Sequence, residues 1–461
     1  KKTSLGKTRF PRSLNNLPSD GGYMSSQAAC ERPVQIVLSG PSGGAAGAAH
    51  LAKTIGILDV LTFDMGGTST DVSLCLGGQV TVRRDVRLGY YNFKAPAVDV
   101  HSVGAGGGSI AYLSISGALQ VGPQSAGANP GPACYGFGGT EPTVTDANVV
   151  LHRIPPSIKL GGELELDEEA AQRAVAKIAE GMGLSVVEAA QAIIDVVNEN
   201  MHAALRVVSV ERGYDPRRFG LVAFGGAGPV HGNALGRLIG SWPVIIPPTP
   251  GVMSAFGFLA ADIQNEFSET YLEIAERTPA AALRDRLARL KQQGREWLEQ
   301  EGVPETDHRF DFLVDCRYYL QNIQIPARVT LEELAEGADC SLLRERFEEE
   351  HQRRYGFTLR APIEMATLRV VARGVIKGVS LTPVDDMGDE DASEAIDRYE
   401  QVYFGGEWVP TPIYARDRLR PGNVVRGPAI VVQEDTTTVI EPGCAGRVDM
   451  FGNILIRPEV G

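Results

Sequence analysis

An apolar run leads into a glycine-rich turn in the stretch Val60-Leu61-Thr62-Phe63-Asp64-Met65-Gly66-Gly67-Thr68-Ser69-Thr70-Asp71. Its apolar half predicts a buried strand, its glycines predict a turn, and residues 70–74 are predicted to return as the second strand of a hairpin. A carboxylate at such a turn can hold Mg²⁺ through water, while glycine N–H groups and threonine hydroxyls can face phosphate oxygens. A tight hairpin without a ligand is the alternative interpretation, because Gly-Gly turns are common.

A second glycine-rich stretch reads Ala223-Phe224-Gly225-Gly226-Ala227-Gly228-Pro229-Val230-His231-Gly232. It follows a predicted strand and precedes a predicted helix, and this geometry presents backbone N–H groups to an anion or a nucleotide. Its spacing matches neither the Rossmann nor the Walker pattern. The alternative is a helix N-terminus that needs small residues for packing. Alone, this motif is a weak signal.

The pattern around these two motifs predicts a mixed α/β architecture, because apolar runs of strand length alternate with amphipathic stretches of helical period. The expected elements are a strand at 34–38, a helix at 43–55, a strand at 60–64, helices at 167–182 and 185–212, a strand at 217–224 and a helix from 230. Ser185 and Glu188 are predicted to form a capping box at the start of the second long helix.

The pattern of predicted helices and strands changes after Asp262. An amphipathic helix is expected at 280–301, strands around 310–329, a charged helix at 341–355 and strand pairs up to Ile456, with a Pro- and Asp-rich link at 381–392. We therefore expect four parts: a linker or cut end at 1–18, the main α/β domain at 19–264, an α+β region at 265–385 and a β-rich region at 386–461.

Composition excludes several classes of protein. The 461 residues are 43% hydrophobic and 22% charged, as in ordinary globular proteins. A net charge of −13 without a Lys/Arg-rich run argues against nucleic acid as a partner. The six cysteines form no C-x-x-C pair, so neither a disulfide framework nor a zinc site is expected. No apolar stretch is long enough for a membrane span, and a cytoplasmic location is expected.

Taken together and in order, the motifs resemble the hydantoinase A/oxoprolinase family. This family includes ATP-dependent N-methylhydantoinases, 5-oxoprolinases and the ATP-using subunits of acetone and acetophenone carboxylases. The resemblance extends from about residue 19 to the C-terminus. The matching segments are 19–22, 24–25, 31–34, 38–44, 64–71, 99–109, 125–135, 138–148, 225–231, 250–255, 354–356 and 427–430.

The resemblance implies an actin-like (ribonuclease H-like) ATPase fold in the main domain and an ATP-driven attack on an unreactive carbonyl. Phosphate is transferred to the carbonyl oxygen, and such transfer is mainly positioning and charge neutralisation. We expect an ATP-binding subunit or fragment of a cyclic amide hydrolase that needs ATP and Mg²⁺ (or Mn²⁺). A hydantoinase B-type subunit or domain would supply the cleavage chemistry, which makes a hetero-oligomer. A ketone carboxylase subunit and a non-catalytic scaffold are the alternatives.

The same resemblance assigns roles to the residues of the two glycine motifs. Asp64 would be the carboxylate near the metal, and Asp71 is the second candidate catalytic carboxylate. The phosphates would contact Gly66, Gly67, Thr68 and Thr70, and the nucleoside would contact Gly225, Gly226 and Gly228.

A further candidate metal or substrate-orienting pair is Asp99 and His101, two residues apart on a predicted strand before a glycine-rich loop. A structural histidine is the alternative for this pair. Cys134 is a candidate reactive thiol, with a small buried cysteine as its alternative. His202 and His231 receive no role, because a lone histidine beside a turn more often caps or packs.

Two departures from the family pattern stand out. Family members usually carry an earlier Asp-x-Gly-Gly-Thr hairpin, the first phosphate strand of the pair, and no such segment precedes residue 19. The sequence leaves three explanations open: a fragment of a longer polypeptide, a split subunit whose partner donates the hairpin, or loss of ATP binding. The second departure is Tyr319-Leu320-Gln321, where the family typically has Gly before Gln, so the local turn is expected to differ.

Overall fold

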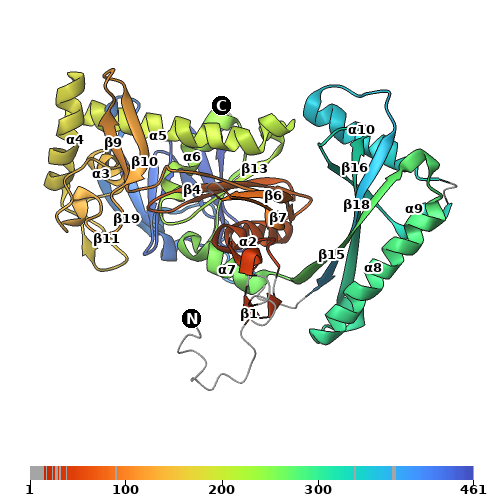
Figure 1. The fold of residues 1–461 in the computed structure, drawn as a ribbon. Helices are drawn as coiled ribbons and strands as arrows, with labels where there is room; N and C mark the ends of the chain where they lie inside the picture. The colour runs from red at the N-terminus through yellow and green to blue at the C-terminus, as the bar shows by residue number, and fades with distance from the viewer. Residues whose placement is uncertain are drawn as a thin grey trace. The chain divides into compact units, whose positions relative to one another are not determined.

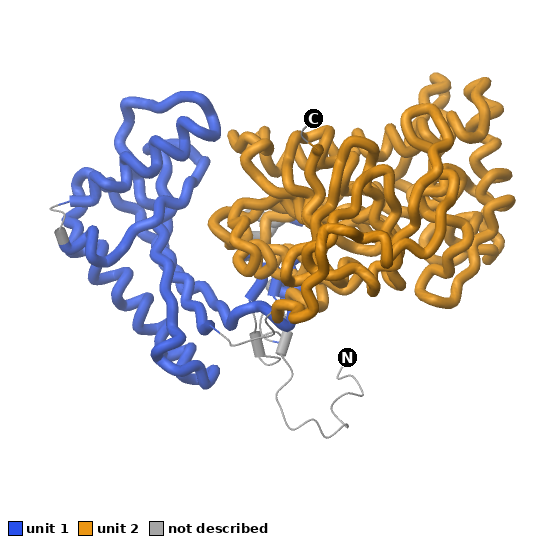
Figure 2. Tube along the Cα trace, turned by 180° about the vertical axis from the view of Figure 1, so that it is seen from behind, with its two compact units in different colours: residues 1–42, 82–97, 258–379 blue, residues 43–81, 98–257, 380–461 orange. Residues whose placement is uncertain are grey.

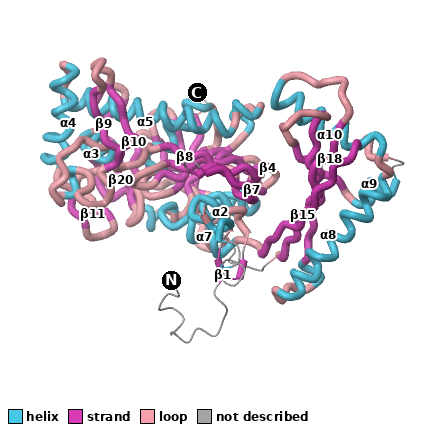
Figure 3. Tube along the Cα trace, in the orientation of Figure 1, coloured by secondary structure: helices cyan, strands magenta, loops and turns pink. Residues whose placement is uncertain are grey.

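The computed structural model describes residues 15–16, 18–22, 24–25, 30, 33–37, 39–88, 91–336, 339–375 and 381–459. The chain forms two compact units, each assembled from separate stretches of sequence (Figure 2). Unit 1 contains Lys1–Ser42, Val82–Ala97 and Phe258–Val379, and unit 2 contains Gly43–Thr81, Val98–Gly257 and Ser380–Gly461. The predicted α/β class is confirmed, since the larger unit contains both strands and helices (Figure 3).

Unit 2 is built on a nine-stranded sheet, as far as the described residues show, with the order β21-β24-β25-β14-β13-β3-β4-β5 and with β8 paired to β4. β3, β13 and β14 are parallel, whereas the flanking strands are antiparallel. The strands are β3 (Val60–Met65), β4 (Thr70–Leu76), β5 (Gln79–Val80), β8 (Val100–Val103), β13 (Gly220–Phe224), β14 (Val244–Ile246), β21 (Val424–Arg426), β24 (Cys444–Val448) and β25 (Ile454–Pro458).

The hairpin predicted for residues 60–74 is present as β3 and β4. Its register pairs Val60 with Cys75 and Met65 with Thr70, so residues 66–69 form the turn. The strand residues between them are almost all buried, because helices cover both faces of the sheet.

Helices lie on both faces of the central sheet (Figure 1), and the side chains that alternate along β3 divide between these two layers. Val60 packs with the alanines of α2 (Ser39–Ile55) and with Met253 at the start of α7 (Met253–Ala260). Leu61, Phe63 and Met65 belong to the larger core on the other face. That core is covered by α3 (Val144–Val150), α4 (Glu168–Met182), α5 (Val186–Val208) and α6 (Gly228–Ile239).

The two long helices begin where the sequence predicts. Asp167 caps α4 by accepting a hydrogen bond from the N–H of Ala170. Ser185 and Glu188 form the predicted capping box of α5. The 185–212 helix nevertheless ends earlier than expected, at Val208, and a 3₁₀ turn (Val210–Arg212) follows it.

The C-terminal segment is not a separate layer of structure. Its strands β21, β24 and β25 extend the central sheet, and β25 pairs directly with β14. A second sheet in this segment has the order β19-β20-β22-β23. Its strands are β19 (Ile396–Phe404), β20 (Glu407–Ala415), β22 (Ala429–Val432) and β23 (Thr437–Ile440). The boundary expected at residue 386 therefore does not separate this segment from the main domain.

Unit 1 contains a four-stranded antiparallel sheet of order β15-β18-β16-β17. Gly294 of α8 lets the helix approach Ala372 of the sheet, where a Cβ would lie 2.8 Å from the alanine methyl group. The elements are β15 (Ile263–Ile274), β16 (His308–Tyr318), β17 (Ile325–Val329), β18 (Ile363–Gly374), α8 (Ala280–Gln300), α9 (Leu331–Glu336) and α10 (Leu342–Tyr355). Two short hairpins also belong to unit 1: β1 (Asn15–Asn16) with β2 (Met24–Ser25), and β6 (Val82–Leu88) with β7 (Tyr91–Val98).

One predicted strand is wrong. The segment expected as a strand at 34–38 instead contains a 3₁₀ helix at Pro33–Ile36, and α2 begins at Ser39 rather than at residue 43. The apolar run has strand-like composition, but no described strand pairs with it. Within the described residues, no helix combines the length and the apolar character needed to cross a membrane.

Candidate functional site

The centre of the candidate site is a pair of carboxylates on one face of the sheet of unit 2. Asp64 of β3 is the direct partner of Asp71 on β4, which in turn is the partner of Ser102 on β8. The Ser102 hydroxyl donates to Asp71 Oδ1, and the Ser254 hydroxyl lies 3.3 Å from Asp64 Oδ2 and donates to it. Each carboxylate therefore has its own hydroxyl donor.

Both carboxylates are harder to ionise than ordinary aspartates. Burial raises the pKa of Asp64 most, and the nearby charge of Asp71 raises it further. The hydrogen bond from Ser254 lowers it, and the resulting pKa is about 6. Burial also raises the pKa of Asp71, against the hydrogen bond from Ser102. Within the described residues neither carboxylate forms an ion pair with a basic side chain. Two crowded carboxylates without a basic partner form a favourable environment for a divalent cation.

Gly44 explains how α2 passes so close to Asp64. A Cβ at this position would lie 2.9 Å from the ring of Phe224 and 3.1 Å from Asp64 Oδ2 and from Ser254 Oγ. The space beside the carboxylate thus depends on the absence of a side chain at residue 44.

The turn of the hairpin is supported by the glycine-rich loop at residues 104–109. The N–H of Gly107 donates to Gly66 O at 3.0 Å, and that of Gly108 donates to Gly67 O at 2.7 Å. A Cβ on Gly106 would lie 2.6 Å from the backbone of Thr68. The loop therefore holds the turn from one side by backbone contact, while Gly67 and Thr68 remain exposed.

The two threonines of the motif differ in environment. Thr68 is exposed at the turn, whereas Thr70 is fully buried and its hydroxyl donates to Ala105 O at 2.5 Å. A contact between Thr70 and phosphate would require this internal hydrogen bond to break.

The second glycine motif lies directly beside the first, because β13 and β3 are parallel neighbours whose carboxyl ends meet at one edge. The N–H of Ala227 donates to Met65 O at 3.0 Å, and that of Gly225 donates to Pro250 O at 3.0 Å. Gly225 has φ +83°, and a Cβ there would lie 2.6 Å from Asp64 Oδ1. Gly226 has more space, and Gly228 is the first residue of α6. The structure thus brings both predicted glycine turns to Asp64.

Asp99 and His101 do not join this site. Val98 and Val100 pack with Ala45 on the α2 side of the sheet, so the residues that alternate with them face the opposite layer. Asp99 is buried and forms an ion pair with Arg212, with Nη2 to Oδ1 at 3.0 Å. In the described part of the chain no cluster of three or more His, Cys, Asp or Glu side chains can hold a metal. The structure therefore does not bring Asp99 and His101, the other candidate metal ligands, together with Asp64.

Cys134, the candidate thiol, and His231, which receives no role from the sequence, are both buried. Cys134 is fully buried, and its pKa is raised by burial and by Asp146, which disfavours a reactive thiolate. His231 lies in the first turn of α6, where Nδ1 is 2.8 Å from Asn198 Oδ1 and Nε2 is 3.3 Å from Asn148 Nδ2. Burial, together with the nearby Arg153, lowers the pKa of His231 to about 3. It links α3, α5 and α6 as a neutral residue.

Sequence reasoning missed the two serines that contact the carboxylates. Ser102 follows His101 in a predicted strand, so alternation places it on the face opposite to His101 but does not indicate that this is the face of Asp71. Ser254 lies in the 250–255 segment that carries the resemblance, and no local pattern indicates that it reaches Asp64. Only the register and the path of the chain bring them together.

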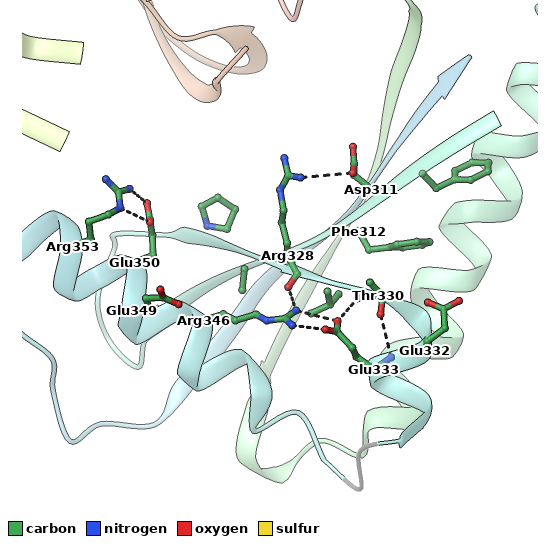
Figure 4. A pocket seen from close by; sticks show the side chains of 14 residues that line it. Asp311, Phe312, Arg328, Thr330, Glu332, Glu333, Arg346, Glu349, Glu350 and Arg353 are labelled. Atoms are coloured by element: carbon green, nitrogen blue, oxygen red, sulfur yellow. Dashed lines mark hydrogen bonds and ion pairs between the residues drawn. The ribbon is translucent and has the colours of Figure 1, made fainter. Parts of the chain in front are cut away.

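A cavity of about 740 Å³ lies in unit 1 (Figure 4). Arg346 pairs with both oxygens of Glu333, and Arg353 Nε lies 2.9 Å from Glu350 Oε2. The pKa of Glu333 falls to about 2, chiefly through its hydrogen bond from Arg346. None of the residues predicted from the two glycine motifs lines this cavity, whose walls are residues 310–312, 326–330, 332, 333, 346, 349, 350 and 353.

Comparison with known protein families matches almost the whole chain. A family model described as hydantoinase/oxoprolinase matches residues 2–267, and one for the hydantoinase/oxoprolinase C-terminal domain matches residues 273–456. The chain belongs to the hydantoinase/oxoprolinase family. The resemblance inferred from the motifs is confirmed.

Among curated relatives of this family, caprolactamase subunit alpha of Pseudomonas jessenii is 35% identical over 456 residues, which cover 95% of this chain and 64% of the relative. A 5-oxoprolinase of Pestalotiopsis fici is 32% identical over 457 residues, 94% of this chain and 34% of the relative. The chain thus spans about two thirds of the first relative and one third of the second.

Two solved structures of the family share the fold. ATP-dependent caprolactamase from Pseudomonas jessenii gives a TM-score of 0.88 at 32% identity, over 97% of this chain and 66% of the other. Nucleotide-free acetone carboxylase gives a TM-score of 0.75 at 27% identity, over 97% and 64% of the two chains. The α/β, actin-like fold class predicted for the main domain is therefore confirmed.

Proposed function

We propose that this chain is the ATP-binding subunit or fragment of a hydantoinase/oxoprolinase-type enzyme that activates a cyclic amide carbonyl by phosphorylation for hydrolysis. The observation that carries the proposal is the convergence of both glycine turns on Asp64, with Gly225 close enough that a Cβ would contact its carboxylate. Family membership and the names of caprolactamase and 5-oxoprolinase among the relatives support the choice of an amide substrate.

Each part of the site has a role in this function. Asp64, with Asp71 beside it, would hold Mg²⁺ or Mn²⁺ through water, and the crowding of two carboxylates supports this role. The N–H groups of Gly67 and Thr68, the exposed residues of the turn, would contact phosphate oxygens, whereas the N–H of Gly66 already donates to Ser69 O at 3.1 Å. Gly225, Gly226 and Gly228 would contact the nucleoside. We do not assign a phosphate contact to Thr70, because its hydroxyl is bonded to Ala105 O.

The reaction requires that the protein position ATP and the amide, and it does not require a covalent nucleophile from the protein. The terminal phosphoryl group of ATP passes to the amide oxygen, which leaves ADP and a phosphorylated intermediate whose oxygen is a good leaving group. One water then attacks the carbonyl carbon, and the ring C–N bond breaks as the nitrogen takes up a proton, which leaves an acyl phosphate. A second water hydrolyses the acyl phosphate to a carboxylate and free phosphate. A hydantoinase B-type subunit or domain would position these waters, so the functional form would be a hetero-oligomer.

Asp64→Ala tests the function in the complete enzyme, assayed with its partner for substrate-dependent release of phosphate from ATP. We expect turnover to fall by at least about 100-fold, because a preorganised charge at the transferring group is lost. Asp59→Ala is a matched control, since Asp59 lies just before the opposite end of β3 and accepts a hydrogen bond from Gly77 N. Unchanged turnover in Asp64→Ala would refute the assignment.

An ATP-using ketone carboxylase subunit is the second candidate, favoured by the structural similarity to acetone carboxylase. It shares the activation step but forms a C–C bond. Dependence on bicarbonate and a carboxylated product would favour it over the hydrolase. Calorimetry with Mg²⁺ and a non-hydrolysable ATP analogue tests the remaining alternative, a scaffold, because micromolar binding contradicts a non-catalytic cleft.

A further inference from the structure

The loop between β22 and β23, residues 433–436, reaches the nucleotide side of the candidate site from the C-terminal part of unit 2. We call it the clamp loop. The Thr436 hydroxyl donates to Gly226 O at 2.8 Å. The carboxylate of Asp435 accepts a hydrogen bond from Gly251 N at 2.7 Å. Two side chains of one loop thus hold two backbone segments that both lie beside Asp64.

The clamp loop is itself held in place. Gln433 Nε2 donates to Asp435 Oδ1 at 2.7 Å and to Pro248 O at 3.2 Å. The carbonyl of Glu434 accepts a hydrogen bond from Gly161 N at 3.1 Å. These bonds fix the orientation of the Asp435 carboxylate before any ligand arrives.

The glycine at residue 251 makes the contact possible. A Cβ there would lie 2.7 Å from Asp435 Oδ2, which is closer than real Cβ contacts allow. Gly251 belongs to the 3₁₀ turn Pro250–Val252, whose Pro250 O accepts from Gly225 N at 3.0 Å. Ser254 follows three residues later and donates to Asp64. Asp435 is therefore connected to both the glycine turn and the carboxylate.

We propose that Asp435 and Thr436 are positioning residues that hold the Gly225-Gly226 turn and the Pro250 segment in the geometry that binds the nucleoside. This inference rests on the proposed function. Of the two glycine turns, the clamp loop bonds to the Gly225-Gly226 turn, whereas the Gly66-Gly67 turn is held by the loop at residues 104–109. Removing the clamp should weaken binding of a whole nucleotide and leave binding of a bare phosphate chain unchanged.

Thr436→Val tests the proposal, because valine has nearly the same shape and lacks the donor. In the complete chain we expect the Kd of a Mg²⁺-bound non-hydrolysable ATP analogue to rise about 5- to 10-fold, the effect of one lost hydrogen bond. The Kd of Mg²⁺-tripolyphosphate should stay within about twofold. Thr436→Ser, which keeps the hydroxyl, should bind like the original chain.

Thr411→Val is the matched control, because Thr411 is fully buried in the same unit and donates to a backbone carbonyl, Val409 O. It should leave both Kd values unchanged. Amide hydrogen exchange at residues 225–227 of the free protein gives a readout that needs no nucleotide, and Thr436→Val should speed it while Thr411→Val should not.

The outcomes separate the two proposals. If the original chain binds no ATP analogue while Thr436→Val speeds exchange at the turn, the clamp stands and the proposed function fails. If Thr436→Val changes neither exchange nor the Kd of the analogue, or weakens tripolyphosphate to the same degree, the clamp is overturned. Asp435→Ala should reproduce the effect of Thr436→Val on the analogue.

Discussion

Asp64 and Asp71 are direct cross-strand partners that present two carboxylates on the same face of the sheet. Burial and mutual repulsion make the ionised pair costly in the folded chain, and the pKa of Asp64 rises to about 6 for this reason. Since the unfolded chain ionises Asp64 at its ordinary pKa, the charge at pH 8 favours unfolding.

Asp64→Asn should therefore stabilise the metal-free protein at pH 8 while abolishing turnover. We expect a gain of about 1 to 3 kcal/mol in the free energy of unfolding, the size of a two-unit pKa shift. Urea unfolding in the presence of a chelator measures it. Asp417→Asn, at an exposed aspartate, should change stability by less than about 0.5 kcal/mol. A loss of stability in Asp64→Asn would contradict the argument.

Gly225→Ala and Gly226→Ala should differ sharply although they are neighbours. At Gly225 a Cβ would lie 2.4 Å from Met65 O, and its φ of +83° is strained for alanine, so we expect a loss of about 3 kcal/mol or more. At Gly226 the nearest atom would be 3.6 Å away, so folding should be nearly unaffected. Thermal unfolding of both variants checks this. Equal losses would show that the close contact does not control stability.

His231→Gln should make the protein less sensitive to acid. The folded-state pKa of His231 is about 3, below the ordinary value of 6.5, so the unfolded state binds more protons and stability falls as pH decreases below 6.5. At pH 5 this penalty amounts to about 2 kcal/mol, and it is absent from the variant.

The original chain should therefore be more stable than His231→Gln at pH 7.5, because the hydrogen bonds to Asn148 and Asn198 are intact. The difference should shrink by about 2 kcal/mol at pH 5. Urea unfolding at both pH values measures it, and a constant difference would mean that His231 is not kept neutral by its surroundings.

Leu320→Gly should stabilise unit 1. Leu320 has φ +71°, the left-handed region that costs leucine about 1 kcal/mol, and its side chain is 85% exposed, so little packing is lost. We expect a rise in melting temperature of a few degrees. Leu272→Gly, at an exposed position within β15, should lower it instead. A lower melting temperature for Leu320→Gly would contradict this reading of the turn.

Local patterns predicted most of the site. The Asp64 hairpin, the capping box of Ser185 and the strand-turn-helix at Gly225 all depend on neighbours in sequence, and all three are present. The turn at Leu320 is not among them: the sequence predicts a turn that differs from the family's, but Leu320 has φ +71°, the left-handed conformation that glycine adopts readily.

Contacts between distant segments could not be predicted. Nothing near Thr436 in the sequence indicates that it bonds to Gly226. The paired strands β14 and β25 are separated in the sequence by residues 258–379 of unit 1. The Asp99 and His101 pair shows the same limit. The sequence indicates that both residues share one face of a strand, but it does not indicate which layer of the unit that face contacts. Register and chain path decide such contacts, and both are properties of the whole sheet.

The pairing of β14 with β25 also sets an order of events during translation. Residues 258–379 form the bulk of unit 1 and are made after β14 and before β25. At ordinary rates of translation, β25 is synthesised about 10 to 40 s after β14. An unpaired strand edge attracts other strands, so a nascent chain of this length would be a target for chaperones. Slow codons between the two strands would prolong that exposure.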